Sequence, residues 1–363
     1  MSNVAARAKS VDTTDVALEN LHDALAAGGL AGLWSRPEIP ATPLARAKAH
    51  LWQWQTVFSL AEQAGKVVRV EGAGDARRAL QFCNPGLANG TTESLFGAYQ
   101  YLQPGEKAPA HRHTASAIRF VMQGQDVFTT VNGDACEMTP GDLILTPSGN
   151  WHDHTNHGDN PIIWFDAIDV PLVMSLESMF FENHPTGMQD VFGHNVSQRN
   201  YGAIGLREVS TKVTAPSHSP LLRYPYDDVS RTLDMVHATR GGPSVTVAYE
   251  NPITGGPALA TITCQMTRLY PGTSTAPRRQ TGGQIHVVFK GKGRSVIEGT
   301  EFTWSPGDVF VAPSWAAVEH DAGELSDLFI TSNRAVLEAL HLYREAVPVE
   351  QQTVIDTFQP ARP

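Results

Sequence analysis

Short runs in which apolar and polar residues alternate fill two separate stretches of the chain, residues 95–171 and residues 259–332. Between the runs stand Gly, Pro, Asn and Asp, which favour tight turns. Because side chains alternate between the two faces of a strand, such runs predict antiparallel β-structure with one buried face. The pattern therefore predicts two blocks of short strands, each a β-sandwich or a β-barrel.

Helical spacing of apolar residues predicts α-helices outside these two blocks. One helix is predicted to end at the Gly28–Gly29 pair, with Thr13 or Thr14 as its N-cap, and another to cover residues 44–65. A C-terminal helix is predicted to follow Asn333. These elements divide the chain into a helical arm with a lead-in (1–94), a first β-block (95–171), a linker region with a few strands of its own (172–258), a second β-block (259–332), and a C-terminal helix with a tail (333–363).

Charge and cysteine content narrow the class of protein. The formal net charge is −10, from 27 Lys and Arg against 37 Asp and Glu, whereas nucleic-acid binding needs clustered Lys and Arg. No run approaches the roughly 18 apolar residues of a membrane helix, and residues 1–15 lack the apolar core of a secretory signal. The three cysteines lie far apart, which is typical of a reduced compartment. We therefore expect a cytoplasmic protein that binds neither nucleic acid nor a membrane, while a small anionic substrate remains compatible with this charge.

The two β-blocks share one pattern of turn residues. In the first block a glycine stands six positions before His111-x-His113, and in the second a glycine stands six positions before Arg278-x-Gln280. A Gly-Asp pair and then a Pro-Ser pair follow at the same spacing in both blocks. Such repetition indicates two copies of one fold. Because only the first copy carries histidines at these positions, we expect one metal site there and none in the second copy.

Three histidines of the first block form a candidate metal site. His111 and His113 are two residues apart on one predicted strand and therefore point to the same face. His152 follows a later turn, which could return it beside the other two. Three neutral imidazoles suit Zn, Fe, Cu, Ni or Mn, so the residue types leave the metal open. Taken alone, the His-x-His pair is as compatible with two surface histidines, to which His152 is unrelated, as with a metal site.

The spacing of glycine, histidine, proline and asparagine over residues 105–156 resembles both cupin sequence motifs almost position for position. The resemblance implies a mainly β bicupin, with two jelly-roll β-barrels, an N-terminal helical arm, and the metal in the first barrel. Cupins usually carry a glutamate ligand after the His-x-His pair, and Ala117 stands at that position here. A site of three histidines leaves about three octahedral positions open. That arrangement suits an iron(II) that must take a chelating substrate and dioxygen together.

Further segments resemble the gentisate 1,2-dioxygenase family of bicupins, which includes salicylate and 1-hydroxy-2-naphthoate dioxygenases. The resemblance implies one Fe(II) per chain, a small aromatic hydroxy acid and dioxygen as partners, and a homo-oligomer such as a tetramer. The implied reaction cleaves the ring bond between the carboxyl- and hydroxyl-bearing carbons, and would convert gentisate to maleylpyruvate. The segments that carry the resemblance are residues 77–87, 97–113, 117–125, 141–156, 164–171 and 309–315.

Polar residues around the three histidines are candidates for binding the substrate. Arg119 is a candidate for gripping the substrate carboxylate, since a guanidinium matches a carboxylate as a planar fork. Counted along an uninterrupted strand from His111 and His113, Arg119 would lie on the same face. Arg77 is assigned the same role by resemblance alone. His154, two residues after His152, is a candidate acceptor for the hydroxyl proton.

The remaining candidates come from positions that match the family's pocket. Gln100 and Asp166 are expected to hydrogen-bond the ligand histidines or the substrate. Phe96 offers only an apolar ring where some family members place an aromatic residue with a polar tip, and Ala98 would tighten the floor of the pocket compared with glycine. Such a site would depend on the reactivity of the substrate. We therefore expect gentisate, whose second hydroxyl enriches the ring in electrons, to be preferred over salicylate and 1-hydroxy-2-naphthoate.

Two other classes of bicupin also deserve comparison with the sequence. Enzymes that resemble oxalate decarboxylase, or isomerases, usually keep the glutamate ligand, and the decarboxylases keep metal residues in both barrels. Ala117 and the replacement of the second set of ligands by Arg278, Gln280 and Val318 disfavour that class. A non-catalytic binding or storage bicupin tends to lose its ligands, whereas here one set is complete. The sequence therefore favours the dioxygenase, with the storage protein as the alternative of another class.

Overall fold

The computed structural model describes residues 16–70, 78–203 and 217–360 of the chain. It divides into two compact units, Met1–Thr42 and Pro43–Pro363. None of the helices in the described residues has the length and apolar character needed to cross a membrane.

The described part of the first unit lies within the segment predicted as the helical arm and lead-in (1–94). It contains helix α1 (Val16–Ala27) and one 3-10 turn, η1 (Leu33–Ser35). Helix α1 ends before Gly29, whose φ of +68° is a left-handed conformation that favours glycine, as the sequence predicts. Thr13 and Thr14, the candidate N-caps, lie outside the described residues.

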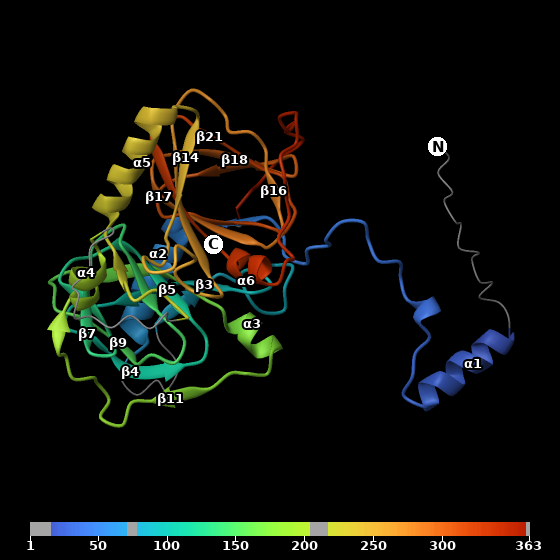
Figure 1. Ribbon diagram of the computed structural model, residues 1–363, viewed down its shortest axis with the longest axis horizontal. Coiled ribbons are helices and arrows are strands. Elements are labelled where there is room, and N and C mark those ends of the chain that lie inside the picture. Colours follow the sequence, from blue (N-terminus) through green and yellow to red (C-terminus); the bar gives the residue numbers. More distant parts are fainter. Residues whose placement is uncertain (1–15, 71–77, 204–216, 361–363) are drawn as a thin grey trace. The chain divides into compact units, whose positions relative to one another are not determined.

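The second unit consists of two halves of related topology (Figure 1). Among the described residues, the N-terminal half contains two six-stranded sheets, and the C-terminal half contains one six-stranded, one four-stranded and one two-stranded sheet. The strands of the N-terminal half are β2 (Ala79–Gln81), β3 (Phe96–Leu102), β4 (Lys107–His113), β5 (Ala117–Gln123), β6 (Val127–Val131), β7 (Asp134–Met138), β8 (Leu143–Thr146), β9 (His152–Asn156), β10 (Ile162–Ile168), β11 (Phe181–Asn183), β12 (Gly193–His194) and β13 (Arg223–Tyr224). They form two sheets, in the orders β13-β8-β5-β10-β3-β2 and β11-β4-β9-β6-β7-β12. Two short helices, α3 (Val170–Ser175) and α4 (Val196–Tyr201), lie between these strands in the sequence.

The C-terminal half repeats this plan. Its strands are β1 (His50–Trp52), β14 (Ser244–Ala248), β15 (Thr263–Leu269), β16 (Arg279–Gln280), β17 (Gln284–Lys290), β18 (Gly293–Ile297), β19 (Thr300–Trp304), β20 (Val309–Ala312), β21 (Val318–Ala322), β22 (Ser326–Ser332), β23 (Glu345–Ala346) and β24 (Asp356–Thr357). The sheet orders are β1-β20-β17-β22-β15-β14, β21-β18-β19-β24 and β16-β23. Helix α6 (Arg334–Ala339) begins after Asn333, as predicted, but is shorter than the predicted helix because the chain turns into β23.

The two halves exchange one edge strand each. Strand β1 precedes the N-terminal half in the sequence but pairs with β20 of the C-terminal half. Strand β13 precedes most of the C-terminal half but pairs with β8 of the N-terminal half. A helix follows each exchanged strand, α2 (Trp54–Val67) after β1 and α5 (Tyr226–Arg240) after β13. Each exchanged strand therefore fastens one half to the other.

These helices differ from the sequence predictions in two respects. Residues 44–65 were predicted as one helix, whereas helix α2 begins only at Trp54 and His50–Trp52 is strand β1. The strand forms because β20 offers it an open edge, which no local pattern reveals. The region 172–258, predicted to be irregular with a few strands, contains the 15-residue helix α5, which packs on β14 (Figure 1).

The starts of α2 and α5 are held in the same way in the two halves. The backbone N–H of Trp54 donates to the carboxylate of Asp308 at 2.8 Å, and that of Tyr226 donates to Asp142 at 3.0 Å. Both aspartates belong to the repeated Gly-Asp pair of the sequence. The repeated Gly-Asp pair thus makes the same contact in both halves. In each, the aspartate accepts the first backbone N–H of the helix that follows an exchanged strand.

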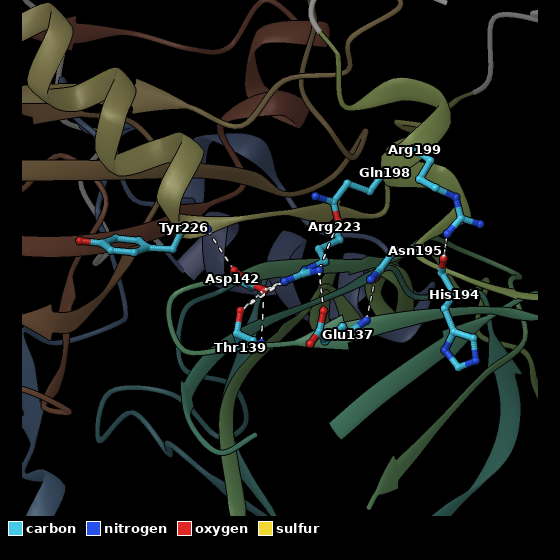
Figure 2. A network of polar contacts seen from close by, with 9 residues as sticks. All are labelled: Glu137, Thr139, Asp142, His194, Asn195, Gln198, Arg199, Arg223 and Tyr226. Atoms are coloured by element: carbon cyan, nitrogen blue, oxygen red, sulfur yellow. Dashed lines mark hydrogen bonds and ion pairs between the residues drawn. The ribbon is translucent and has the colours of Figure 1, made fainter. Parts of the chain in front are cut away.

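A buried ion pair reinforces the joint at Asp142 (Figure 2). Arg223 of strand β13 donates from Nε to the Asp142 carboxylate at 2.8 Å and from Nη1 to Glu137 at 3.1 Å. The hydroxyl of Thr139 donates to the same carboxylate at 2.6 Å. The backbone N–H groups of Thr139, at 3.2 Å, and of Tyr226 also donate to it, so groups of three residues share the Asp142 charge. Separating β13 from β8 would leave the buried Asp142 carboxylate without its charged partner, which costs free energy. The ion pair therefore holds β13 on β8.

Aromatic side chains fill the contact between the two large sheets. The rings of Phe120, on β5, and Phe329, on β22, are stacked with centroids 4.2 Å apart and an interplanar angle of 9°. The Tyr99 hydroxyl of β3 donates to the carbonyl of Gly307 in the C-terminal half at 2.8 Å. All three side chains that make these contacts are fully buried. The halves therefore share one hydrophobic core.

Candidate metal centre

Three histidines meet in the second sheet of the N-terminal half. His111 and His152 are direct partners in the pairing of β4 with β9, and His113 follows two residues later on the same face. Possible ligand nitrogens of the three side chains lie within 4.8 Å of one another. His152 is almost fully buried, and His113 is half-buried. The structure thus gathers the three residues that spacing singled out.

Backbone carbonyls fix which nitrogen of each ring is available to a metal. The Nδ1 atoms of His111, His113 and His152 lie 3.3, 2.7 and 3.0 Å from the carbonyl oxygens of residues 109, 115 and 150. A carbonyl only accepts, so each Nδ1 carries the proton and each Nε2 keeps its lone pair. Holding the outer nitrogen in this way orients imidazole ligands in metal sites. The three residues therefore fit a metal bound through Nε2.

The ring of Phe181 covers two of these histidines. Strand β11 pairs with β4, which places Phe181 opposite His113 and Asn183 opposite His111. The Phe181 ring stacks on the His111 imidazole with centroids 5.1 Å apart and an interplanar angle of 21°. The sequence analysis missed this residue because β11 is short and exposed and lies in a segment without strand alternation.

Three of the predicted substrate-binding or catalytic residues lie side by side on the other sheet of the N-terminal half. Ala98 on β3, Asp166 on β10 and Arg119 on β5 are direct neighbours across three strands. Counting along an uninterrupted strand predicts that Arg119 lies on the same strand face as His111 and His113. This prediction is wrong, because β4 ends at His113 and Arg119 lies on β5, which belongs to the other sheet. Arg119 nevertheless reaches the second sheet, since its Nε donates to His154 Nε2 at 3.2 Å.

The guanidinium of Arg119 is buried among polar groups. Its Nη1 donates to the hydroxyl of Thr146, and its Nε lies 3.7 Å from the carboxylate of Asp166. Burial lowers the pKa of Arg119, while the neighbouring Asp166 raises it. The indole of Trp164 donates to the same Asp166 carboxylate at 2.9 Å. Trp164 and Thr146 are positioning groups that sequence reasoning did not identify.

The remaining candidates lie near this row or outside the described residues. Gln100 is buried on β3, and Phe96, at the start of the same strand, is half-buried. Both stand two positions from Ala98 along the strand and therefore share its face. Ala117, at the position of the missing glutamate, is fully buried at the start of β5. Arg77 lies outside the described residues, although its neighbour Arg78 is buried and pairs with Glu106 at 2.6 Å.

Comparisons with known proteins agree with this geometry. Residues 98–168 match the family described as Cupin domain. A gentisate 1,2-dioxygenase from a Streptomyces species is 38% identical over 339 residues, which cover 90% of this chain and 94% of the relative. The chain belongs to the gentisate 1,2-dioxygenase family. A 5-aminosalicylate 1,2-dioxygenase from a Comamonas species is 35% identical over 362 residues, 96% of each chain.

Comparison with a solved structure shows that the similarity covers nearly the whole fold of this chain. The salicylate 1,2-dioxygenase of Pseudoaminobacter salicylatoxidans, with gentisate, superposes with a TM-score of 0.88 and 32% identity, over 96% of this chain and 98% of that chain. The predicted bicupin fold is thereby confirmed. The chain is an enzyme, a ring-cleaving dioxygenase for an aromatic substrate and dioxygen, and its three histidines form the group that can hold the metal cofactor.

In this dioxygenase the C-terminal half has different residues at the ligand positions. Arg278 pairs with Val318 in the register in which His111 pairs with His152, and Gln280 follows at the position of His113. Deeper in this half, His286 lies on β17 and His320 on β21, with ring centroids 5.5 Å apart. Burial lowers the pKa of His320 to about 4 and that of His286 well below its ordinary value, so both rings are neutral at neutral pH.

Proposed function

We propose that this dioxygenase uses one iron(II) per chain, held by His111, His113 and His152, to cleave the ring of gentisate and give maleylpyruvate. The observation that carries the proposal is the set of three imidazoles whose Nδ1 atoms are anchored on carbonyls. Among the described residues, the group that can hold the metal contains no carboxylate. Bound there, iron(II) supplies open coordination positions and electron transfer between an electron-rich ring and dioxygen.

Arg119 binds the substrate carboxylate in this proposal. Its bonds to His154 and Thr146 use Nε and Nη1, which leaves Nη2 to donate to the substrate. Asp166 lies 3.7 Å from the guanidinium and offsets part of the cost of burying its charge. Arg77 is proposed as a second group for the carboxylate, and Gln100 as a hydrogen-bond partner within the pocket.

His154 accepts the proton of the substrate's ortho hydroxyl in this proposal. Its Nε2 atom receives a hydrogen bond from Arg119, so this nitrogen carries the lone pair. When the substrate carboxylate draws the guanidinium towards itself, Nε2 becomes available for the proton. Asp166 then stabilises the positive charge that His154 gains.

Gentisate is the proposed substrate because the site offers little beyond the chelate to hold the ring. Phe96 presents an apolar ring, and Ala98 narrows the floor beside Asp166. Salicylate and 1-hydroxy-2-naphthoate lack the para hydroxyl that enriches the ring of gentisate, and form the alternative substrates. Names of the relatives support this class of substrate, since they include gentisate and 5-aminosalicylate dioxygenases. A homotetramer or similar homo-oligomer is the proposed assembly.

The decisive experiment measures oxygen consumption and ring-opened product with the iron-loaded chain. The values of kcat/KM for gentisate, salicylate and 1-hydroxy-2-naphthoate are compared under the same conditions. We expect the largest value for gentisate. A larger value for either other acid contradicts the choice of substrate, and absence of oxygen consumption with all three contradicts the dioxygenase in favour of a binding bicupin.

A further inference from the structure

Hydrogen bonds connect four buried side chains, beginning at the arginine proposed to bind the substrate carboxylate. Arg119 donates from Nε to His154 Nε2 at 3.2 Å. On the other side of the ring, His154 Nδ1 lies 2.8 Å from the hydroxyl oxygen of Thr129. That hydroxyl lies 3.1 Å from the sulfur of Met138. Thr129, Met138 and His154 are fully buried, and Arg119 is 2% exposed.

The direction of every hydrogen bond between these side chains follows from the arginine. A guanidinium can only donate, so His154 Nε2 must accept and carry no proton. The proton of the neutral ring then lies on Nδ1, which donates to Thr129. Since the Thr129 oxygen accepts this bond, its own proton is directed to the Met138 sulfur, a weak acceptor. Thr129 and Met138 thus provide acceptors for the tautomer of His154 that can receive Arg119.

The C-terminal half repeats the hydroxyl and the imidazole without the arginine. Ser295 pairs with His320 across two strands as Thr129 pairs with His154, and its hydroxyl lies 2.7 Å from His320 Nδ1. At the position of Met138 stands Trp304, whose indole donates to Ser295 at 2.9 Å. Because Trp304 donates to the serine oxygen, the serine proton can point at His320 Nδ1. The C-terminal half therefore does not require that this imidazole donate to the hydroxyl, as His154 does in the N-terminal half.

We propose that Thr129 is a positioning residue for the substrate carboxylate, acting through His154 and Arg119. Without an acceptor at Nδ1, the tautomer that receives Arg119 would bury an unpaired Nδ1–H and lose stability relative to the other tautomer, whose Nε2–H faces the Nε–H of Arg119. Two donors in contact repel, and Arg119 is displaced from its place beside Asp166. The inference rests on the proposed role of Arg119 in binding the substrate carboxylate.

The test compares three variants of the full metal-loaded chain. Thr129→Val is nearly isosteric and removes the acceptor, Thr129→Ser keeps it, and Ser295→Ala removes the matching hydroxyl from the C-terminal half as a control. We measure KM and kcat for gentisate, the Kd for gentisate without oxygen, and bound iron. Thr129→Val should raise KM and Kd about tenfold, the effect of one lost hydrogen bond, with a smaller change in kcat and unchanged iron. Thr129→Ser and Ser295→Ala should keep the KM of the unaltered chain.

Other outcomes overturn the inference. These are a Thr129→Val variant with unchanged KM and Kd, a Thr129→Ser variant as impaired as Thr129→Val, or an equal effect of Ser295→Ala, which would indicate a general packing effect. If Thr129→Val does not fold, Met138→Leu takes its place. It conserves volume and frees the threonine proton to point at His154, so KM should rise several-fold; an unchanged KM overturns the inference. An unaltered chain that neither binds nor oxidises gentisate contradicts the proposed function instead.

Discussion

The ring of Phe181 stacks on the imidazole of His111, with centroids 5.1 Å apart. Phe181 is 39% exposed and stands on β11, which pairs with the strand of the metal ligands. It therefore shields one side of the candidate metal centre, and it belongs to a part of the chain far from both histidine motifs.

Removal of this ring should weaken metal binding without unfolding the chain. Aromatic stacking is worth about 0.5–1.5 kcal/mol, so Phe181→Ala should raise the dissociation constant for iron(II) by up to about tenfold. The measurement is a competition titration with a chelator. The neighbouring, more exposed Phe180 offers a matched control, because Phe180→Ala removes a ring that does not stack on a ligand. Equal effects of both variants would contradict a specific role of Phe181.

Each of the three histidine ligands should be essential for metal binding. Replacement of His111, His113 or His152 by Ala leaves two imidazoles, and we expect iron content to fall from one per chain towards zero and turnover to be lost. Iron is measured by elemental analysis, and folding by circular dichroism. The exposed His157 serves as control, and His157→Ala should keep both iron and activity. Two irons per chain, or full activity in any ligand variant, would disprove the assignment.

The C-terminal half should contribute packing and assembly rather than chemistry. Gln280 takes the position of His113 there, and its side chain is half-buried. Its backbone carbonyl accepts the backbone N–H of Trp315, a bond that Gln280→Ala retains. Because Gln280→Ala removes only half-buried side-chain packing, it should change the melting temperature or the oligomeric state, by about 1 kcal/mol or less in stability, while kcat stays within twofold. Thermal unfolding, light scattering and steady-state kinetics check this. A large fall in kcat with unchanged iron and assembly would show a catalytic role of this half.

Buried histidines of the C-terminal half should make the chain sensitive to acid. Burial lowers the pKa of His320 to about 4 and lowers that of His286 well below its ordinary value, whereas the unfolded value is about 6.5. Between these values the unfolded state binds more protons, so the free energy of unfolding falls as pH decreases from about 6.5 to 4. The slope is at most about 1.4 kcal/mol per pH unit for each histidine.

The variant His320→Gln isolates this effect. It removes a proton site from the unfolded state, and its amide can still hydrogen-bond Ser295. Unfolding by urea at pH 7.5, 6.0 and 5.0 should show a shallower pH dependence than in the unaltered chain. His157→Gln, at an exposed position, is the control. Parallel pH dependences of the unaltered chain and His320→Gln would refute the prediction.

Sequence reasoning reached those parts of the site that local spacing determines. His111 and His113 share a face because strands have a period of two, and His152 follows the turn at the repeated Pro-Ser pair. It did not reach Phe181 or Thr129, whose roles depend on pairing between strands distant in sequence. Aligning the two β-blocks beyond their turns would have set Thr129 beside Ser295, which is the one signal available for it.

The fold shows the same division. Most strands of the two blocks follow from alternation and turns, but β1 consists of three residues and forms only against β20. Counting along the sequence places Arg119 on the strand of His111. It fails because the chain crosses to the other sheet after His113, and the sequence pattern does not show this crossing. Helix α5 begins at Tyr226, where a turn in the other half receives its first amide. Such long-range contacts leave no periodic trace in the sequence.

The exchange of β1 and β13 also constrains how the chain can acquire its structure. During synthesis, the N-terminal half emerges first, yet β1 cannot pair until β20, near the other end of the chain, has left the ribosome. Contacts of such large sequence separation slow folding. A cut before Arg223 would leave each fragment without an edge strand, so we expect the two halves to fold as one cooperative unit. Gene fragments that encode either half alone should yield aggregation-prone chains with an unpaired sheet edge.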